Sequence, residues 1–229
     1  MLKFTPLLLA VLYGIAMYQF SAWRTRKELD ARSTELADAR MRTITDRLAV
    51  ALDVARVPVY IYEIDPVNGL AAPDGRIFIT RGFYRKYQSG EVSAEELASV
   101  IAHELGHVAL GHSRRRMIDF SGQNALRTAL AMVLGRHIPF IGAWIAGMLT
   151  SLLAARLSQS DEYEADAYAA ALLTKAGFGV EPQKAMFRKL DALTQARAGM
   201  VPAWLMTHPK VQDRIAALEK LEARWHTSG

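Results

Sequence analysis

The sequence contains no cysteine among its 229 residues. This absence excludes a disulfide framework, a thiolate metal site and a cysteine nucleophile. A metal site in this chain must therefore use histidine, aspartate or glutamate. The length allows one domain with a sizeable core together with a membrane segment.

The sequence also lacks a basic stripe interleaved with aromatic residues, although its formal net charge is +5. Much of that charge lies in two clusters, at positions 24–27 and 114–116. We therefore expect no nucleic-acid partner. A lipid bilayer with anionic headgroups explains the two clusters better.

Long charge-free runs are scarce, and one of them, residues 4–23, lies at the start of the chain. A helix over this run would span about 30 Å, the thickness of a bilayer core. A cleaved signal peptide is the alternative, but no small-x-small cleavage site closes the run. The sequence predicts an uncleaved N-terminal transmembrane helix, with residues 1–24 as a membrane anchor. The positive charges after the run favour a catalytic part facing the cytoplasm, and the periplasmic side stays open.

The remaining periodicity predicts a mainly helical α+β domain over residues 25–229, with a small β-sheet. Ser93 and Glu96 form a capping-box pattern at the start of one helix. The expected helices cover residues 25–55, 93–112, 160–176, 182–198 and 209–225, and the expected strands cover 57–64 and 76–80.

A second apolar stretch covers residues 138–157. A single crossing would place the residues before and after it on opposite sides of a membrane. Two crossings would need about 40 apolar residues, and the region 125–157 is shorter than that. We therefore predict a helical hairpin over 125–157 that packs on the domain or dips into one leaflet, with its turn at 135–139.

The sequence His103-Glu104-Leu105-Gly106-His107 lies within the helix expected at 93–112. Histidines at i and i+4 stand on one helix face, so both imidazoles can bind one zinc ion. Glu104 would then take a proton from the water bound to that ion. Gly106 is expected to leave room beside the metal.

The third ligand is expected from a later helix. Glu162 and Asp166 share a small, apolar helix face with Ala165, whereas Asp161 and Glu164 fit a solvated helix start. We predict Glu162 as the ligand and Asp166 as the acceptor of a hydrogen bond from a ligand histidine. His112 fits a helix-end histidine better than a ligand.

Three segments resemble the forty-eighth family of metallopeptidases, which includes the HtpX-type and CAAX prenyl proteases. They are residues 95–107, the Glu162-Tyr163-Glu164-Ala165-Asp166 segment, and Thr207-His208-Pro209 followed by Asp213-Arg214-Ile215. The resemblance covers about residues 55–225 and implies a gluzincin-type fold with Glu162 as third ligand.

The resemblance further implies that His208 donates to the oxyanion and that Arg214 lies near the site. It implies a substrate-binding β-edge, formed by Asn68, Gly69, Leu70, Ile77, Phe78 and Ile79. The family usually has Asn-Ala-Phe at the first three of these positions, so Gly69 and Leu70 are departures. A bacterial inner membrane is the implied location.

We therefore expect a membrane-anchored zinc endopeptidase with one Zn²⁺ per chain, acting on unfolded or membrane-associated proteins. An extended substrate is expected to pair with a strand near residues 76–80. The alternative is a non-enzymatic membrane scaffold or chaperone-like protein with a structural zinc, which would have a closed four-ligand site. The sequence does not indicate an oligomeric state.

Overall fold

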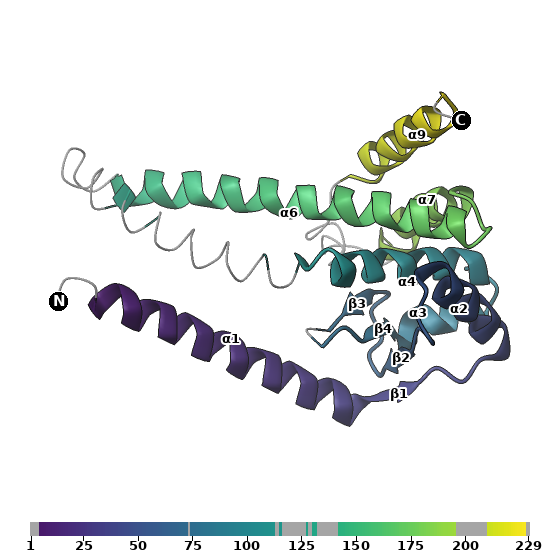
Figure 1. Cartoon of the computed structure of the whole chain (residues 1–229), viewed down its shortest axis with the longest axis horizontal. Coiled ribbons are helices and arrows are strands. Elements are labelled where there is room, and N and C mark those ends of the chain that lie inside the picture. The colour runs from purple at the N-terminus through teal and green to yellow at the C-terminus, as the bar shows by residue number, and fades with distance from the viewer. Residues whose placement is uncertain are drawn as a thin grey trace. The chain divides into compact units, whose positions relative to one another are not determined.

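The computed structural model describes residues 5–72, 74–112, 115, 127, 130–131, 142–195 and 210–227. The chain forms two compact units. The first contains Met1–Thr25 and Gly111–Ser160, and the second contains Arg26–Leu110 and Asp161–Gly229. Helices α1 (Thr5–Arg32) and α6 (Gly142–Lys175) each contribute to both units (Figure 1).

The first unit contains most of α1 and the first half of α6. Within the described part of the chain, we find no helix that combines the length and the apolar character needed to cross a membrane. The turn expected at 135–139 and most of the first arm of the hairpin lie outside the described residues.

The helix expected over residues 25–55 is wrong, because the chain breaks in the middle of that range. Helix α1 ends at Arg32, strand β1 covers Ser33–Glu35 and helix α2 covers Ala39–Leu52. The side chain of Asp38 accepts a hydrogen bond from the Met41 backbone N–H at 2.9 Å, which begins the new helix. The residues between the two helices pair with a strand instead of continuing a helix.

The sheet of the second unit has four strands in the order β1-β2-β4-β3. Strand β2 covers Val59–Tyr62, β3 covers Gly69–Ala71 and β4 covers Ile77–Thr80. Strands β2 and β4 are parallel, and the two outer pairs are antiparallel. All four residues of β4 are buried, as expected for an inner strand. Helix α3 (Arg81–Gln88) follows β4 directly.

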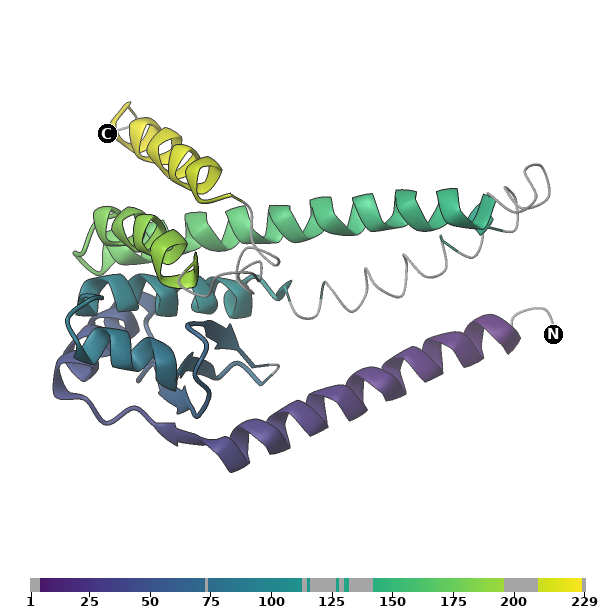
Figure 2. The ribbon, with the colours of Figure 1, turned by 180° about the vertical axis from the view of Figure 1, so that it is seen from behind.

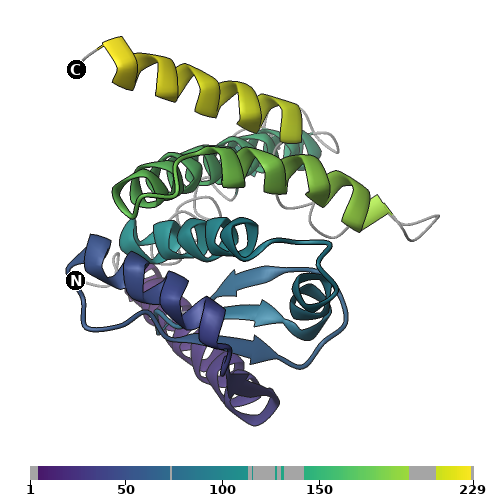
Figure 3. The same ribbon diagram turned by 90° about the vertical axis from the view of Figure 1, so that its right-hand side faces the viewer.

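Helix α4 (Ala94–Ala109) lies between the sheet and helix α7 (Glu181–Gln195), as Figure 3 shows. The predicted capping box is confirmed, because Ser93 and Glu96 each accept a backbone hydrogen bond from the other. Helix α9 (Val211–Thr227) packs on α7 (Figure 2). The mainly helical α+β class with a small sheet is confirmed.

The helix expected at 160–176 is longer than predicted. Its end lies within one residue of the prediction, at Lys175, and Gly177 follows after Ala176 with a φ of 77°, which favours glycine. Its start is wrong, because α6 already begins at Gly142 and continues without a break. Asp161 and Glu164 therefore do not lie at a helix start, and Asp161 is buried rather than solvated.

Candidate metal centre

Helix α4 presents His103 and His107 on one face, one turn apart. Both side chains are buried, and their Nε2 atoms lie 3.1 Å apart. The two rings meet edge to face at a centroid distance of 4.8 Å. Both Nε2 atoms therefore point to the same place.

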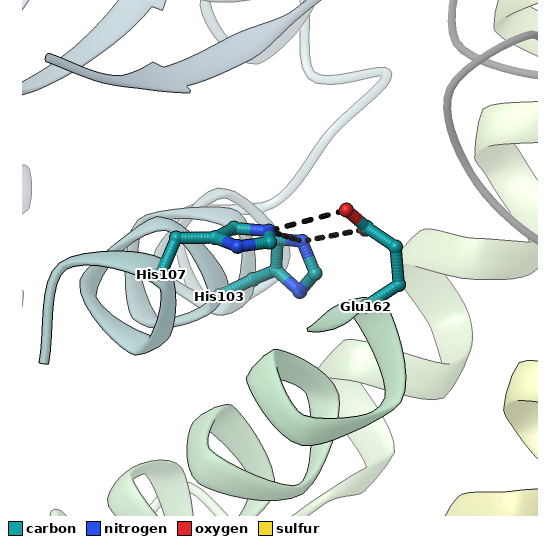
Figure 4. A group of neighbouring side chains, drawn as sticks. All are labelled: His103, His107 and Glu162. Atoms are coloured by element: carbon teal, nitrogen blue, oxygen red, sulfur yellow. Dashed lines mark hydrogen bonds and ion pairs between the residues drawn. The ribbon is translucent and has the colours of Figure 1, made fainter. Parts of the chain in front are cut away.

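Glu162 reaches these two histidines from α6 (Figure 4). Its carboxylate oxygens lie 3.3 Å from the Nε2 of His103 and 3.4 Å from the Nε2 of His107. Ligand atoms about 2.0–2.1 Å from a tetrahedral zinc would be about 3.3 Å from one another. The three donor groups therefore fit a zinc ion in both chemistry and spacing.

The close approach of α4 and α6 depends on Gly106. A Cβ atom at this position would lie 3.0 Å from the carbonyl oxygen of Ala165 and 3.1 Å from its Cα. The expectation that Gly106 leaves room beside the metal is wrong. The glycine makes room for the backbone of the helix that carries Glu162.

Asp166 lies one turn after Glu162 and is 1% exposed. Its carboxylate accepts a hydrogen bond from the Nδ1 of His103 at 2.8 Å and another from the Nε of Arg214 at 2.6 Å. This partner fixes the orientation of the His103 ring and leaves its Nε2 for a metal. The guanidinium of Arg214 also lies 4.1 Å above the ring of Phe187.

Charge pairing changes the protonation of this cluster. Burial lowers the pKa of His103, but hydrogen bonds to Asp166 and Glu162 outweigh burial, and the pKa rises to about 9. Burial raises the pKa of Asp166, but Arg214 and His103 together hold it below its usual value. In the metal-free chain, His103 is therefore a cation between carboxylates at neutral pH.

Glu104 lies beside strand β3, in contact with the edge of the sheet. A Cβ atom built at Gly69 would lie 3.3 Å from a carboxylate oxygen of Glu104. A cavity of about 20 Å³, large enough for one water molecule, adjoins Glu104 and His103. Its walls come from β3, α3, α4, α7 and α9.

The expected pairing of a substrate with residues 76–80 is wrong, because β4 is an inner strand with partners on both sides. Its residues Ile77, Phe78 and Ile79 are at most 1% exposed. Strand β3 lies at the end of the strand order instead. The edge next to Glu104 is therefore formed by Gly69, Leu70 and Ala71.

Sequence analysis missed Thr80, which holds the start of this edge. Its buried hydroxyl accepts hydrogen bonds from the backbone N–H groups of Asn68, at 3.1 Å, and Phe83, at 3.3 Å. The backbone N–H of Thr80 in turn donates to the carbonyl of Asn68. The position of Thr80 as the N-cap of α3 could be recognised from the sequence, whereas its contact with Asn68 could not.

The sequence contains two further candidate histidines, His112 and His208. His208, the expected oxyanion donor, lies outside the described residues. His112 lies after the end of α4 and is 1% exposed. The metal-ligating group that the described residues form consists of His103, His107 and Glu162.

Several metalloproteases are similar to this chain in sequence. Metalloprotease LoiP of Escherichia coli K12 is 30% identical over 201 residues, 83% of this chain and 77% of that protein. The mitochondrial metalloendopeptidase OMA1 of Bos taurus is 24% identical over 71% of this chain. A putative beta-barrel assembly-enhancing protease of Vibrio cholerae is 30% identical over 74% of this chain. The matches cover only 32% of OMA1 and 36% of the Vibrio protein.

The profile of peptidase family M48 matches residues 35–222, most of the chain. The matched range contains both histidines and Glu162, whose donor atoms the fold brings together. The chain therefore belongs to peptidase family M48.

Proposed function

We propose that this chain is a zinc-dependent endopeptidase whose ion is held by His103, His107 and Glu162. The observation that carries the proposal is the tetrahedral spacing of these three donor atoms next to Glu104 and strand β3, which lies at the end of the order of the described strands. A zinc ion held there would polarise a peptide carbonyl and acidify a water molecule.

Glu104 supplies the acid–base chemistry in this proposal. Glu104 is 8% exposed, and its carboxylate lies beside Gly69 of β3 and next to a cavity that His103 also lines. It takes a proton from the attacking water and passes it to the leaving amine. Asp166 and Arg214 hold the His103 ring in position throughout. His208 is retained as a candidate oxyanion donor on the strength of the motif.

The test of this proposal is the substitution Glu104→Gln. The amide has the same shape as the carboxylate but cannot accept the proton, so cleavage of an unfolded protein should be lost. Zinc content should stay at one ion per chain, because the three ligands are unchanged. Turnover by the zinc-loaded variant at the wild-type rate would contradict the assignment.

We propose that the substrate pairs with the outer edge of β3. Asn68 and Ala72 make their backbone hydrogen bonds toward β4. Because backbone groups alternate along a strand, those of Gly69 and Ala71 face the outer edge. An extended chain bound there would be recognised through its backbone, which suits unfolded or membrane-associated proteins.

Ala71→Pro tests this pairing, because proline removes an outward N–H group. We expect kcat/KM on a casein-type substrate to fall by at least about tenfold while zinc content is unchanged. Ala71→Ser keeps the N–H group and is the matched control. Equal cleavage by the proline and serine variants would exclude pairing at this edge.

A scaffold or chaperone-like protein with a structural zinc is the second candidate. A structural site needs four protein ligands. The described residues supply three, which is the number that a catalytic zinc site takes from the protein. This observation favours the enzyme.

We further propose that the first unit associates with a membrane, with residues 1–24 as its anchor. Tyr13, Phe20 and Trp23 of α1 are each more than half exposed, and so is Trp144 of α6. Aromatic side chains next to basic residues are typical of the membrane interface. The chain should therefore remain in the membrane fraction after alkaline extraction, and removal of residues 1–24 should weaken that retention.

The side of the membrane and the path of residues 125–157 are testable because the chain has no cysteine. Single cysteines at Ser121 and Ser158 would be treated with an impermeant thiol reagent. We propose a hairpin that does not cross, in a bacterial inner membrane with the catalytic part in the cytoplasm. Labelling of both cysteines from the periplasm would reverse the orientation, and labelling from opposite sides would overturn the hairpin.

A further inference from the structure

Gly69 lies against the catalytic helix at a distance that leaves no room for a side chain. A Cβ atom at this position would lie 2.7 Å from a methyl carbon of Val100 and 3.3 Å from a carboxylate oxygen of Glu104. The φ of Gly69 is outside the left-handed region that favours glycine. Space, and not backbone conformation, is therefore what excludes a larger residue here.

Neither side of this contact can move easily. Val100 is β-branched, so its side chain has one strongly preferred rotamer in a helix. Strand β3 is fixed on both sides of Gly69, by the hydrogen bonds of Asn68 to Thr80 and of Ala72 to Arg76. An added methyl group would therefore change the spacing between β3 and α4 or displace the Glu104 carboxylate.

The same glycine also belongs to the proposed substrate edge. Its backbone N–H and C=O groups face outward, whereas its missing side chain would point at α4. The distance between β3 and α4 therefore sets how far a bound peptide lies from Glu104. Catalysis is sensitive to this distance, since a misplacement of about 1 Å can cost about a hundredfold in rate.

We propose that Gly69 and Val100 form a size-matched positioning pair, which sets the distance between the substrate-binding edge and the general base. This inference rests on the proposed endopeptidase function. It assigns to Val100, which is neither a proposed metal ligand nor part of the substrate edge, a role in the rate of the reaction.

The test is a double-mutant cycle of Gly69→Ala, Val100→Ala and the double variant, each loaded with zinc. Gly69→Ala should lower kcat by about a hundredfold and change KM by less than about threefold, because the outward backbone groups are kept. The double variant should recover at least tenfold of that loss, because the nearest obstructing methyl is gone. A purely structural role of the two residues would not lower kcat while leaving KM nearly unchanged.

Two controls accompany the cycle. Gly147→Ala, where an added methyl would meet no atom of the described residues nearer than 3.9 Å, should leave kcat unchanged. Zinc content should be equal in every variant.

Wild-type kcat for Gly69→Ala would overturn the inference, and so would a double variant no faster than that single variant. A rise in KM with kcat unchanged would do the same. A zinc-loaded wild type without any cleavage is a different result, because it refutes the proposed function itself. In that case the unfolding free energies of the same four proteins still show whether the two residues are coupled.

Discussion

Asp166 is the residue on which the orientation of the ligand histidine depends. It is buried between two basic groups, the His103 ring and the Arg214 guanidinium. A buried ion pair contributes little by comparison with an apolar pair of the same size, but removal of one partner is costly, because the other charge is left buried. The carboxylate therefore serves both the metal site and the fold.

Asp166→Asn should weaken zinc binding and the fold together. The amide cannot neutralise Arg214, so we expect the metal-free protein to lose about 3–5 kcal/mol in its free energy of unfolding. Loss of the carboxylate partner of His103 should lower zinc affinity by about 10–100-fold. Urea unfolding and competition with a zinc chelator measure the two effects.

Asp213→Asn is the matched control, because Asp213 precedes Arg214 but is exposed. It should change the free energy of unfolding by no more than about 0.5 kcal/mol. If Asp166→Asn and Asp213→Asn had the same effect on the free energy of unfolding and on zinc affinity, the buried Asp166–Arg214 pair would not contribute to the site.

At the scale of elements, the metal site depends on the crossing of α4 and α6. The three ligands come from these two helices, and Gly106 faces the Ala165 backbone where they meet. A backbone neighbour cannot rotate away as a side chain can. The contact of Gly106 with the Ala165 backbone therefore fixes the separation of the two helices next to the three ligands.

Gly106→Ala should separate the helices and move Glu162 away from the two histidines. Alanine gains about 1 kcal/mol of helix propensity over glycine, but overpacking costs about 1–3 kcal/mol. We expect a net loss of stability and a fall in zinc affinity of at least about tenfold, measured by urea unfolding and chelator competition. Gly147→Ala should gain helix stability without any change in zinc affinity, and the same gain for Gly106→Ala would disprove the close crossing.

At the scale of the whole molecule, stability and metal binding should respond oppositely to pH. The pKa of His103 in the metal-free fold is about 9, above its ordinary value of 6.5. A raised pKa contributes stability that is complete below about pH 6.5 and is lost as the pH rises through 9. Zinc binding requires the neutral imidazole, so zinc affinity should increase over the same range.

Thermal unfolding of the chelator-treated protein between pH 6 and pH 9.5 measures the first effect, and zinc titration at the same pH values measures the second. His103→Gln should remove most of the fall in stability across this range. A metal-free wild type that becomes more stable from pH 6.5 to pH 9 would contradict the raised pKa.

The sequence alone determined those features that depend on local spacing. Histidines at i and i+4 share a helix face wherever the helix packs, so His103 and His107 were identifiable as a pair. The helical phase of residues 162–173 selected Glu162 and Asp166 because both lie on a buried face, which the structure confirms. The capping box at Ser93 is likewise a local pattern.

Tertiary structure decided the features that depend on contacts between distant segments. Residues 77–80 form the inner strand and residues 69–71 the edge, because β4 pairs with both β2 and β3. The composition of the strands does not indicate which of them lies inside the sheet. The sequence showed a glycine at 106 and another at 69, but not that one faces Ala165 and the other Glu104. A glycine has no side chain whose chemistry could indicate its neighbour, so only the packed fold shows what each one makes room for.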